Sequence, residues 1–95
     1  MNYQIASKYS GLFKLFSDPF AILVTSYLLG NEAAQTMEVI AKETEASNSK
    51  IYRTCEKLYG LGIVDRGTQG EEPTYEVLNS NENTKVARNI LSSLN

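Results

Sequence analysis

The stretch that decides the fold is Thr36–Val64, which reads TMEVIAKETEASNSKIYRTCEKLYGLGIV. Thr36 is a good N-cap residue and predicts a short helix that ends near Thr44. Ser47 predicts the cap of a further helix, which ends at the glycines of Gly60–Gly62. Two helices joined by so short a turn are the pattern of a helix-turn-helix.

Apolar residues in this stretch recur at helical spacing and identify the faces expected to lie in the core. In the first helix they are Val39, Ile40 and, as a further candidate, Met37. In the second they are Ile51, Cys55 and Leu58. The residues between them are mostly polar or charged, so the second helix is predicted to expose its other face.

Two more helices are predicted before this stretch. The first covers Ile5–Phe16, whose bulky residues form one helical stripe: Ile5, Tyr9, Leu12, Phe13 and Phe16. Asp18 followed by Pro19 is a cap followed by proline at the first helical position, and it predicts the start of the second. This helix is expected to end at Gly30-Asn31 in a left-handed turn. Its apolar face is predicted to comprise Phe20, Leu23, Val24, Tyr27 and Leu28.

A hairpin and a last helix are predicted after the stretch. Ile63–Arg66 and Thr74–Leu78 are strand-like runs joined by a turn-rich loop, Gly67–Pro73. A polar run at 79–83 then precedes a helix with the apolar stripe Val86, Ala87, Ile90, Leu91 and Leu94. We therefore expect residues 1–95 to form a single domain of mainly α class with a small β-hairpin (α+β), a winged helix-turn-helix with N- and C-terminal flanking helices.

The composition limits the chemistry that the chain can perform. It has one cysteine, Cys55, and no histidine, which excludes disulfide frameworks, multi-thiolate zinc sites and imidazole-based catalysis. We therefore expect no cofactor, no metal and no enzymatic activity. No apolar run of membrane-spanning length appears, so a cytoplasmic protein without a membrane partner is expected. Nine basic and eleven acidic residues give a net charge of −2, so any contact with nucleic acid must be local.

Two segments resemble the ArsR-type winged helix-turn-helix regulators. Leu12–Leu29 resembles the opening of those proteins, in which an Asp-Pro pair caps the second helix. Thr36–Val64 resembles their helix-turn-helix core, with a small residue at Ala41 and Leu61–Val64 leading into the wing. These features are also compatible with MarR-like and TrmB-like regulators. Glu45 stands where such turns usually have glycine, and the cysteine-rich metal motif is absent, so the resemblance is to a member that does not sense metals.

The helix after Ser47 is the candidate DNA-reading element. Lys50, Arg53 and Lys57 against Glu56 give it a positive surplus on a chain that is otherwise negative. A solvated helix face would carry the same charges, but their place between a turn and a wing favours contact with duplex DNA. Lys50 is expected to read bases from the first turn, and Lys57 to contact phosphate. The candidate DNA-binding residues are Ser47, Asn48, Ser49, Lys50, Tyr52, Arg53 and Lys57 on this helix and Arg66 on the wing.

The wing carries charges of both signs. Arg66 is expected to reach a phosphate or the adjacent minor groove, whereas Glu71 and Glu72 would repel phosphate. The hairpin tip is therefore not expected to lie deep in a groove, and an ordinary solvated loop is the alternative. Cys55 lies on the inward stripe and is interpreted as a small buried hydrophobe, with a redox switch as the less favoured alternative.

The two terminal helices carry more bulky apolar residues than a helix-turn-helix core of this size covers. In ArsR-type regulators these helices form a two-fold dimer interface, and the resemblance implies the same here. The candidate interface residues are Tyr9, Leu12, Phe13, Phe16, Val86, Ile90, Leu91 and Leu94. Packing of both helices within one chain is the alternative.

The sequence therefore predicts a homodimeric transcriptional regulator that binds double-stranded DNA sequence-specifically, with two recognition helices in successive major grooves. The alternative is a winged-helix module for protein–protein interaction with little DNA binding, which the acidic residues Glu45, Glu71 and Glu72 favour. The sequence identifies no small-molecule inducer.

Overall fold

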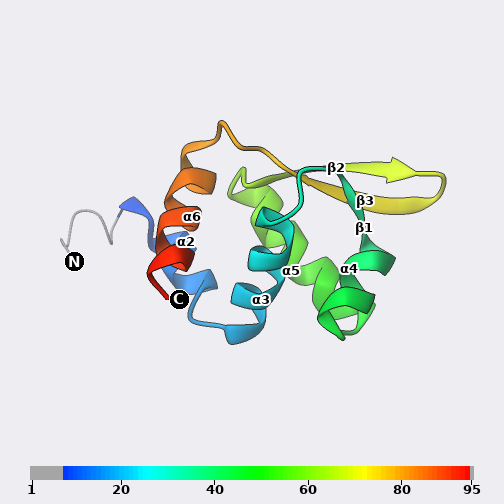
Figure 1. Cartoon of the computed structure of the whole chain (residues 1–95), viewed down its shortest axis with the longest axis horizontal. Helices are drawn as coiled ribbons and strands as arrows, with labels where there is room; N and C mark the ends of the chain where they lie inside the picture. Colours follow the sequence, from blue (N-terminus) through cyan, green and yellow to red (C-terminus); the bar gives the residue numbers. More distant parts are fainter. Residues whose placement is uncertain (1–7, 95) are drawn as a thin grey trace.

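A computed structural model describes residues 8–94, and the elements are spread along one long axis, with α6 returning beside α2 (Figure 1). α3 (Pro19–Leu29) and α5 (Asn48–Gly60) lie in the middle of the molecule. At one end lie α4 (Met37–Thr44) and the hairpin of β2 (Val64–Gln69) and β3 (Glu72–Val77). At the other lie α2 (Ser10–Leu15) and α6 (Glu82–Ser93). With the short strand β1 (Gln35–Thr36), the fold is the predicted mainly helical one with a small sheet.

Side chains at the predicted caps start three of the helices. The Asp18 carboxylate accepts a hydrogen bond from the Phe20 backbone N–H at 3.0 Å, and Pro19 is the first residue of α3. Thr36 Oγ1 accepts from Val39 N at 3.2 Å at the start of α4. Ser47 Oγ accepts from Lys50 N at a longer 3.4 Å at the start of α5. Each cap satisfies a backbone donor that has no partner within its own helix, which confirms the three predicted starts.

The ends of the helix-turn-helix pair share one backbone motif. Ala46 N donates to Ala41 O at 3.0 Å after α4, and Ile63 N donates to Leu58 O at 3.0 Å after α5. Such bonds accompany a residue in the left-handed region. After α5 that residue is Gly62, with φ 77°, and after α4 it is Glu45, with φ 55° and ψ 41°.

The end of α3 differs from the prediction. Gly30 has φ −83° and ψ −2°, so the helix does not end in a left-handed turn. Its N–H instead donates to the carbonyl oxygens of Ser26 and Tyr27 at 3.2 Å, and the Asn31 side chain donates to Tyr27 O at 2.6 Å. These bonds satisfy the last carbonyls without a positive φ, which is why the glycine signal was misleading here.

The three strands form an antiparallel sheet in the order β1-β3-β2. Pairing of β2 with β3 continues from Val64↔Val77 out to Gln69↔Glu72, so the predicted loop 67–73 is wrong and only a two-residue turn separates the strands. Gly70 has φ 65°, and a glycine at the first position of a two-residue turn matches the twist of paired strands. β1 was not predicted, because two residues are too few to show an alternating pattern.

The core lies where α3, α4, α5 and the hairpin meet. Its fully buried members include Val24, Leu28, Ile40, Ile51, Cys55, Leu58, Ile63, Val64 and Tyr75. Two predicted core positions are wrong: Leu23 is 49% exposed and Val39 is 40% exposed. On α3 the buried side chains are Ala21, Val24, Thr25 and Leu28, and on α4 they are Ile40 and Thr44. Each set occupies a single helical stripe, which leaves the apolar residue beside it outside the core.

The flanking elements pack against each other at the end away from the hairpin. Of the predicted helix Ile5–Phe16, residues 5–7 lie outside the described residues, and the rest is shorter than predicted because Tyr9 and Phe16 flank α2 in turns. The Tyr9 hydroxyl donates to Glu82 Oε1 at 2.7 Å, which joins this segment to the start of α6. α6 begins after Asn81, whose side chain accepts from Asn83 N at 2.8 Å.

Candidate nucleic-acid interface

α5 buries one face and divides its exposed residues between two flanks. Its buried side chains are Ile51, Thr54, Cys55 and Leu58. One flank faces the start of α3 and carries Lys50, Arg53 and Lys57. The other faces the hairpin and carries Tyr52, Glu56 and Tyr59. Asn48 and Ser49 are exposed at the beginning of the helix.

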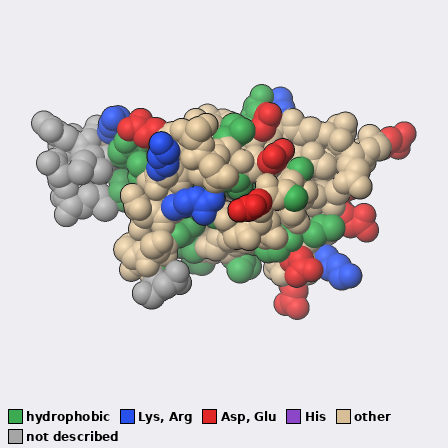
Figure 2. Space-filling view, turned by 45° about the horizontal axis from the view of Figure 1, so that its top comes forward, with side chains coloured by type: hydrophobic (Ala, Val, Ile, Leu, Met, Phe, Trp, Pro, Cys, Tyr) green, Lys and Arg blue, Asp and Glu red, His purple; other side chains and the backbone are tan. Residues whose placement is uncertain are grey.

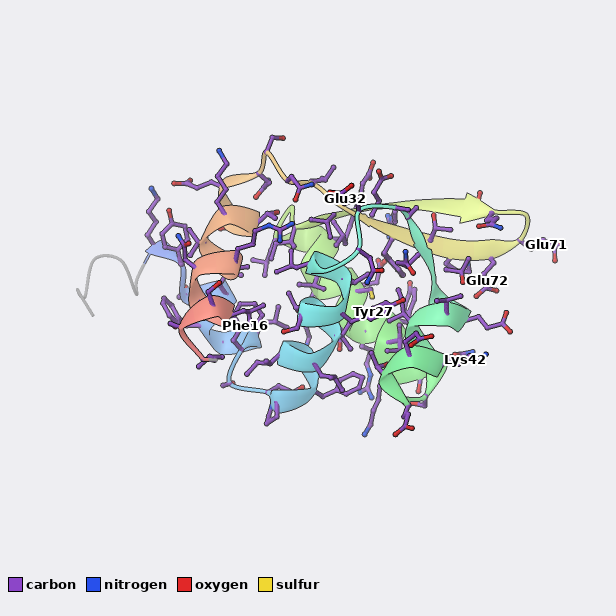
Figure 3. All side chains as sticks on the ribbon, viewed as in Figure 1. Phe16, Tyr27, Glu32, Lys42, Glu71 and Glu72 are labelled. Carbon is purple, nitrogen blue, oxygen red and sulfur yellow. The ribbon has the colours of Figure 1, made fainter. Side chains whose placement is uncertain are left out.

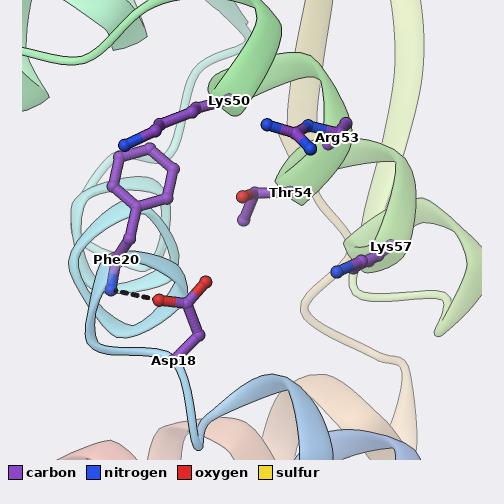
Figure 4. A pocket seen from close by; sticks show the side chains of 6 residues that line it. All are labelled: Asp18, Phe20, Lys50, Arg53, Thr54 and Lys57. Atoms are coloured by element: carbon purple, nitrogen blue, oxygen red, sulfur yellow. Dashed lines mark hydrogen bonds between the residues drawn. The ribbon is translucent and has the colours of Figure 1, made fainter.

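The first flank lines a basic pocket of about 210 Å³ (Figure 4). Lys50, Arg53 and Lys57 extend into it from α5, opposite Asp18 and Phe20 at the start of α3. The Lys50 ammonium lies 5.7 Å from the centroid of the Phe20 ring, within the range of a cation–π interaction. Asp18 is the carboxylate among the lining residues, and its Oδ1 is already the acceptor for Phe20 N. The pocket therefore has a clear excess of positive charge.

The second flank ties α5 to the hairpin. Arg66 Nη1 lies 2.6 Å from Glu56 Oε1, and the guanidinium lies 4.2 Å from the centroid of the Tyr59 ring. The Tyr75 hydroxyl donates to the second Glu56 oxygen at 3.2 Å. Burial raises the pKa of the Tyr75 hydroxyl above its ordinary value, so the group stays a neutral donor. Arg66 thus has a carboxylate partner on α5, which competes with a phosphate for its guanidinium.

The tip of the hairpin is acidic. Glu71 projects from the tip, and Glu72 Oε1 accepts from the Glu38 backbone N–H at 3.0 Å in the first turn of α4 (Figure 3). In Figure 2, acidic side chains gather at the end of the molecule that holds the hairpin and α4. One N-terminal amide of α4 already has a carboxylate partner, so this helix end is poorly suited to a phosphate.

Cys55 is buried at 0% exposure in the core cluster, as predicted. Burial raises the pKa of its thiol to about 12, with the neighbouring Glu56 carboxylate as a second cause. The thiolate is the reactive form of cysteine, so the thiol is inert near neutral pH. These observations support a packing role.

The candidate dimer residues are spread over different environments. Leu12 is 1% exposed and Leu91 is 8% exposed in the single chain, so both pack within that chain and have little surface left for a partner. Leu94 is 59% exposed. The remaining candidates are half-buried: Tyr9, Phe13, Phe16, Val86 and Ile90. Packing within one chain therefore accounts for part of the apolar surplus, and the interface itself stays a prediction.

Two kinds of site have no candidate within residues 8–94. No three side chains of the Asp, Glu, Cys or His types gather there in a way that could hold a metal ion. None of the helices in this range combines the length and the apolar character that crossing a membrane requires.

No protein-family model and no functionally curated protein matches the sequence. Solved structures do match the fold. The AntR antimony-specific transcriptional repressor aligns with a TM-score of 0.76 and 12% identity, over 96% of this chain and 77% of AntR. The transcriptional repressor PagR of Bacillus anthracis aligns with a TM-score of 0.69 and 22% identity, over 99% of this chain and 100% of PagR. The chain has the fold of winged-helix transcriptional repressors.

A third winged-helix structure agrees with this result. The homodimeric winged helix-turn-helix DNA-binding domain of a possible ArsR-family transcriptional regulator from Mycobacterium bovis aligns with a TM-score of 0.68 and 12% identity, over 96% of this chain and 78% of that one. The resemblance to ArsR-type regulators is thus confirmed at the level of fold. In this winged helix α4 and α5 form the helix-turn-helix, α5 has the place of a recognition helix in such folds, and the hairpin of β2 and β3 is the wing.

Proposed function

We propose that the protein is a cytoplasmic transcriptional regulator that binds double-stranded DNA sequence-specifically as a homodimer. The basic flank of the recognition helix is the observation that carries this proposal. Lys50, Arg53 and Lys57 face one pocket on a chain whose net charge is −2, so the positive field is concentrated where a winged helix presents its recognition helix. That the similar structures are transcription regulators, rather than enzymes, supports the same function.

The exposed start of α5 supports reading of base edges. Asn48, Ser49 and Tyr52 are exposed and carry amide or hydroxyl groups that donate and accept hydrogen bonds. Such side chains, at the end of the helix that enters the major groove, suit sequence readout. Arg66 on the wing adds less than the sequence suggested, because Glu56 holds it at 2.6 Å.

The homodimer is supported by apolar surface at the end formed by α2 and α6. Leu94 is 59% exposed, and Phe13 and Ile90 are half-buried on the same end of the molecule. The similar domain from Mycobacterium bovis is a homodimer. A second chain would cover this surface and add to a core that is small in a chain of 95 residues.

Selection of bound duplexes from a random DNA pool tests the function. We expect enrichment of a two-fold symmetric site whose half-sites lie about one helical turn, or 10–10.5 base pairs, apart. Affinity for this site should exceed that for a scrambled duplex and fall with rising salt. Failure to enrich any sequence, with no salt-dependent binding to either duplex, would contradict the proposal.

A protein-interaction module is the second candidate function, and the acidic wing favours it. Glu71 projects from the wing tip, and the Glu72 carboxylate accepts a hydrogen bond from the Glu38 amide at the start of α4. Carboxylates at this end of the molecule suit a basic protein partner better than DNA. The selection experiment separates the two candidates, because an interaction module of this kind would enrich no duplex.

A further inference from the structure

The basic pocket continues into a second hollow that reaches α2. This second pocket, of about 580 Å³, shares Asp18, Thr54 and Lys57 with the first and extends to Lys14. The two pockets are adjacent because they share these lining residues, and we call them together the basic groove. It runs from Lys50 and Arg53, past Lys57, to Lys14 in the last turn of α2.

The basic groove gathers nearly half of the lysine and arginine residues of the chain. Its cations are Lys14, Lys50, Arg53 and Lys57, four of the nine lysine and arginine residues. Among residues 8–94 the ion pairs are Lys8–Glu82 and Arg66–Glu56, so none of the four is neutralised in this way. The groove also contains one negative charge, the Asp18 carboxylate, which caps α3.

The spacing of these cations suits a strand of nucleic acid. Positions 50, 53 and 57 lie about 4.5 Å and about 6 Å apart along the helix axis, at 1.5 Å per residue. One DNA strand carries one phosphate charge per nucleotide, so a row of cations along one helix flank can contact more than one phosphate of the same strand. Gly60 adds no side chain to the wall, and a Cβ built there would meet nothing within 4 Å, so the groove stays open towards Lys14.

We propose that the backbone phosphates of one DNA strand occupy the basic groove, with Lys14 as a contact from outside the helix-turn-helix. This inference rests on the proposed DNA-binding function and assigns roles within it. Lys50 and Lys57 then position the backbone, in contrast to the base-reading role that the sequence suggested for Lys50. Base readout falls to Asn48, Ser49 and Tyr52, which are exposed and do not line the groove.

Alanine variants of single lysines test this division of roles. We expect Lys14→Ala, Lys50→Ala and Lys57→Ala each to weaken binding to a selected site and to a scrambled duplex by the same factor. Each should also lower the slope of log affinity against log salt by about 0.9 per protomer, since one fewer counterion is released. Lys85→Ala is the matched control, because Lys85 is exposed on α6 and does not line the groove. Circular dichroism melts establish that all four variants are folded.

The outcomes separate this inference from the proposed function. If Lys14→Ala behaves as Lys85→Ala does, or if Lys50→Ala changes the preference at one base pair with the salt slope intact, the backbone assignment is overturned while DNA binding stands. If the wild-type protein binds no duplex, the proposed function fails. Inorganic phosphate is titrated into the free protein, and its binding to the groove is followed by NMR. If the protein binds phosphate in the groove with the same affinity as it binds the scrambled duplex, the groove is a site for a free oxyanion and the inference is overturned.

Discussion

Replacing Glu45 with glycine is expected to stabilise the protein by about 0.5–1 kcal/mol. Glu45 is exposed and holds φ 55° and ψ 41° in the turn of the helix-turn-helix. A left-handed backbone costs an L-residue about 1–2 kcal/mol, which glycine avoids. Glycine also gives the unfolded chain more conformational freedom, which lowers the free energy of unfolding by about 0.5–1 kcal/mol and offsets part of this gain. For a domain of this size the melting temperature should rise by about 2–8 °C.

Urea unfolding and a thermal melt measure this effect, and two variants control it. Glu45→Ala makes the same change in charge but keeps a Cβ in the left-handed region, so it should leave stability nearly unchanged. Gly62→Ala should destabilise the protein, because Gly62 has φ 77° and a Cβ there would lie 2.5 Å from Asn81 Nδ2. If Glu45→Ala stabilises the protein as much as Glu45→Gly, the effect comes from charge, and the backbone argument is refuted.

Three further predictions concern the cap, the thiol and the dimer. Ser47→Ala should cost about 0.5–1 kcal/mol in urea unfolding, at the lower end for N-caps because the bond to Lys50 N is 3.4 Å long; no loss would place the helix start elsewhere. Burial raises the pKa of Cys55 from 9.0 to about 12, so the unfolded thiol ionises first, and stability present below pH 9 should be lost towards pH 12. Cys55→Ala should show a smaller decline over that range, and an equal decline would contradict the assignment. If the proposed homodimer forms through α2 and α6, Leu94→Glu should give a folded monomer in light scattering, whereas Leu23→Glu, at a residue 49% exposed on α3, should leave the dimer intact.

Features set by local chemistry could be predicted from the sequence. Asp18 with Pro19, Thr36 and Ser47 each place an oxygen acceptor or a fixed φ beside the first free amides of a helix, and no distant residue is needed for this. The burial of Cys55 follows similarly from its spacing to Ile51 and Leu58. The helix-turn-helix order therefore emerged from neighbouring residues alone.

Features set by contacts between distant residues could not be predicted in this way. The strands extend to Gln69 and Glu72 because pairing across the hairpin outweighs the turn-like composition of that segment. Arg66 was expected to be available for DNA, but its partner Glu56 lies on another element. Lys14 gave no signal as a site residue, since it joins the basic groove only when α2 packs beside α5.

The contact between α5 and the wing also bears on the entropy of the proposed DNA binding. Glu56 is shared between Arg66 and Tyr75, so one carboxylate fixes both strands of the hairpin to α5. These two contacts hold the wing against α5 in the folded chain, before any ligand arrives. A preorganised surface loses less freedom on association, so more of the interaction energy remains as affinity. If these contacts of Glu56 were removed, the wing would have to become ordered on binding, and that loss of conformational entropy would reduce the affinity.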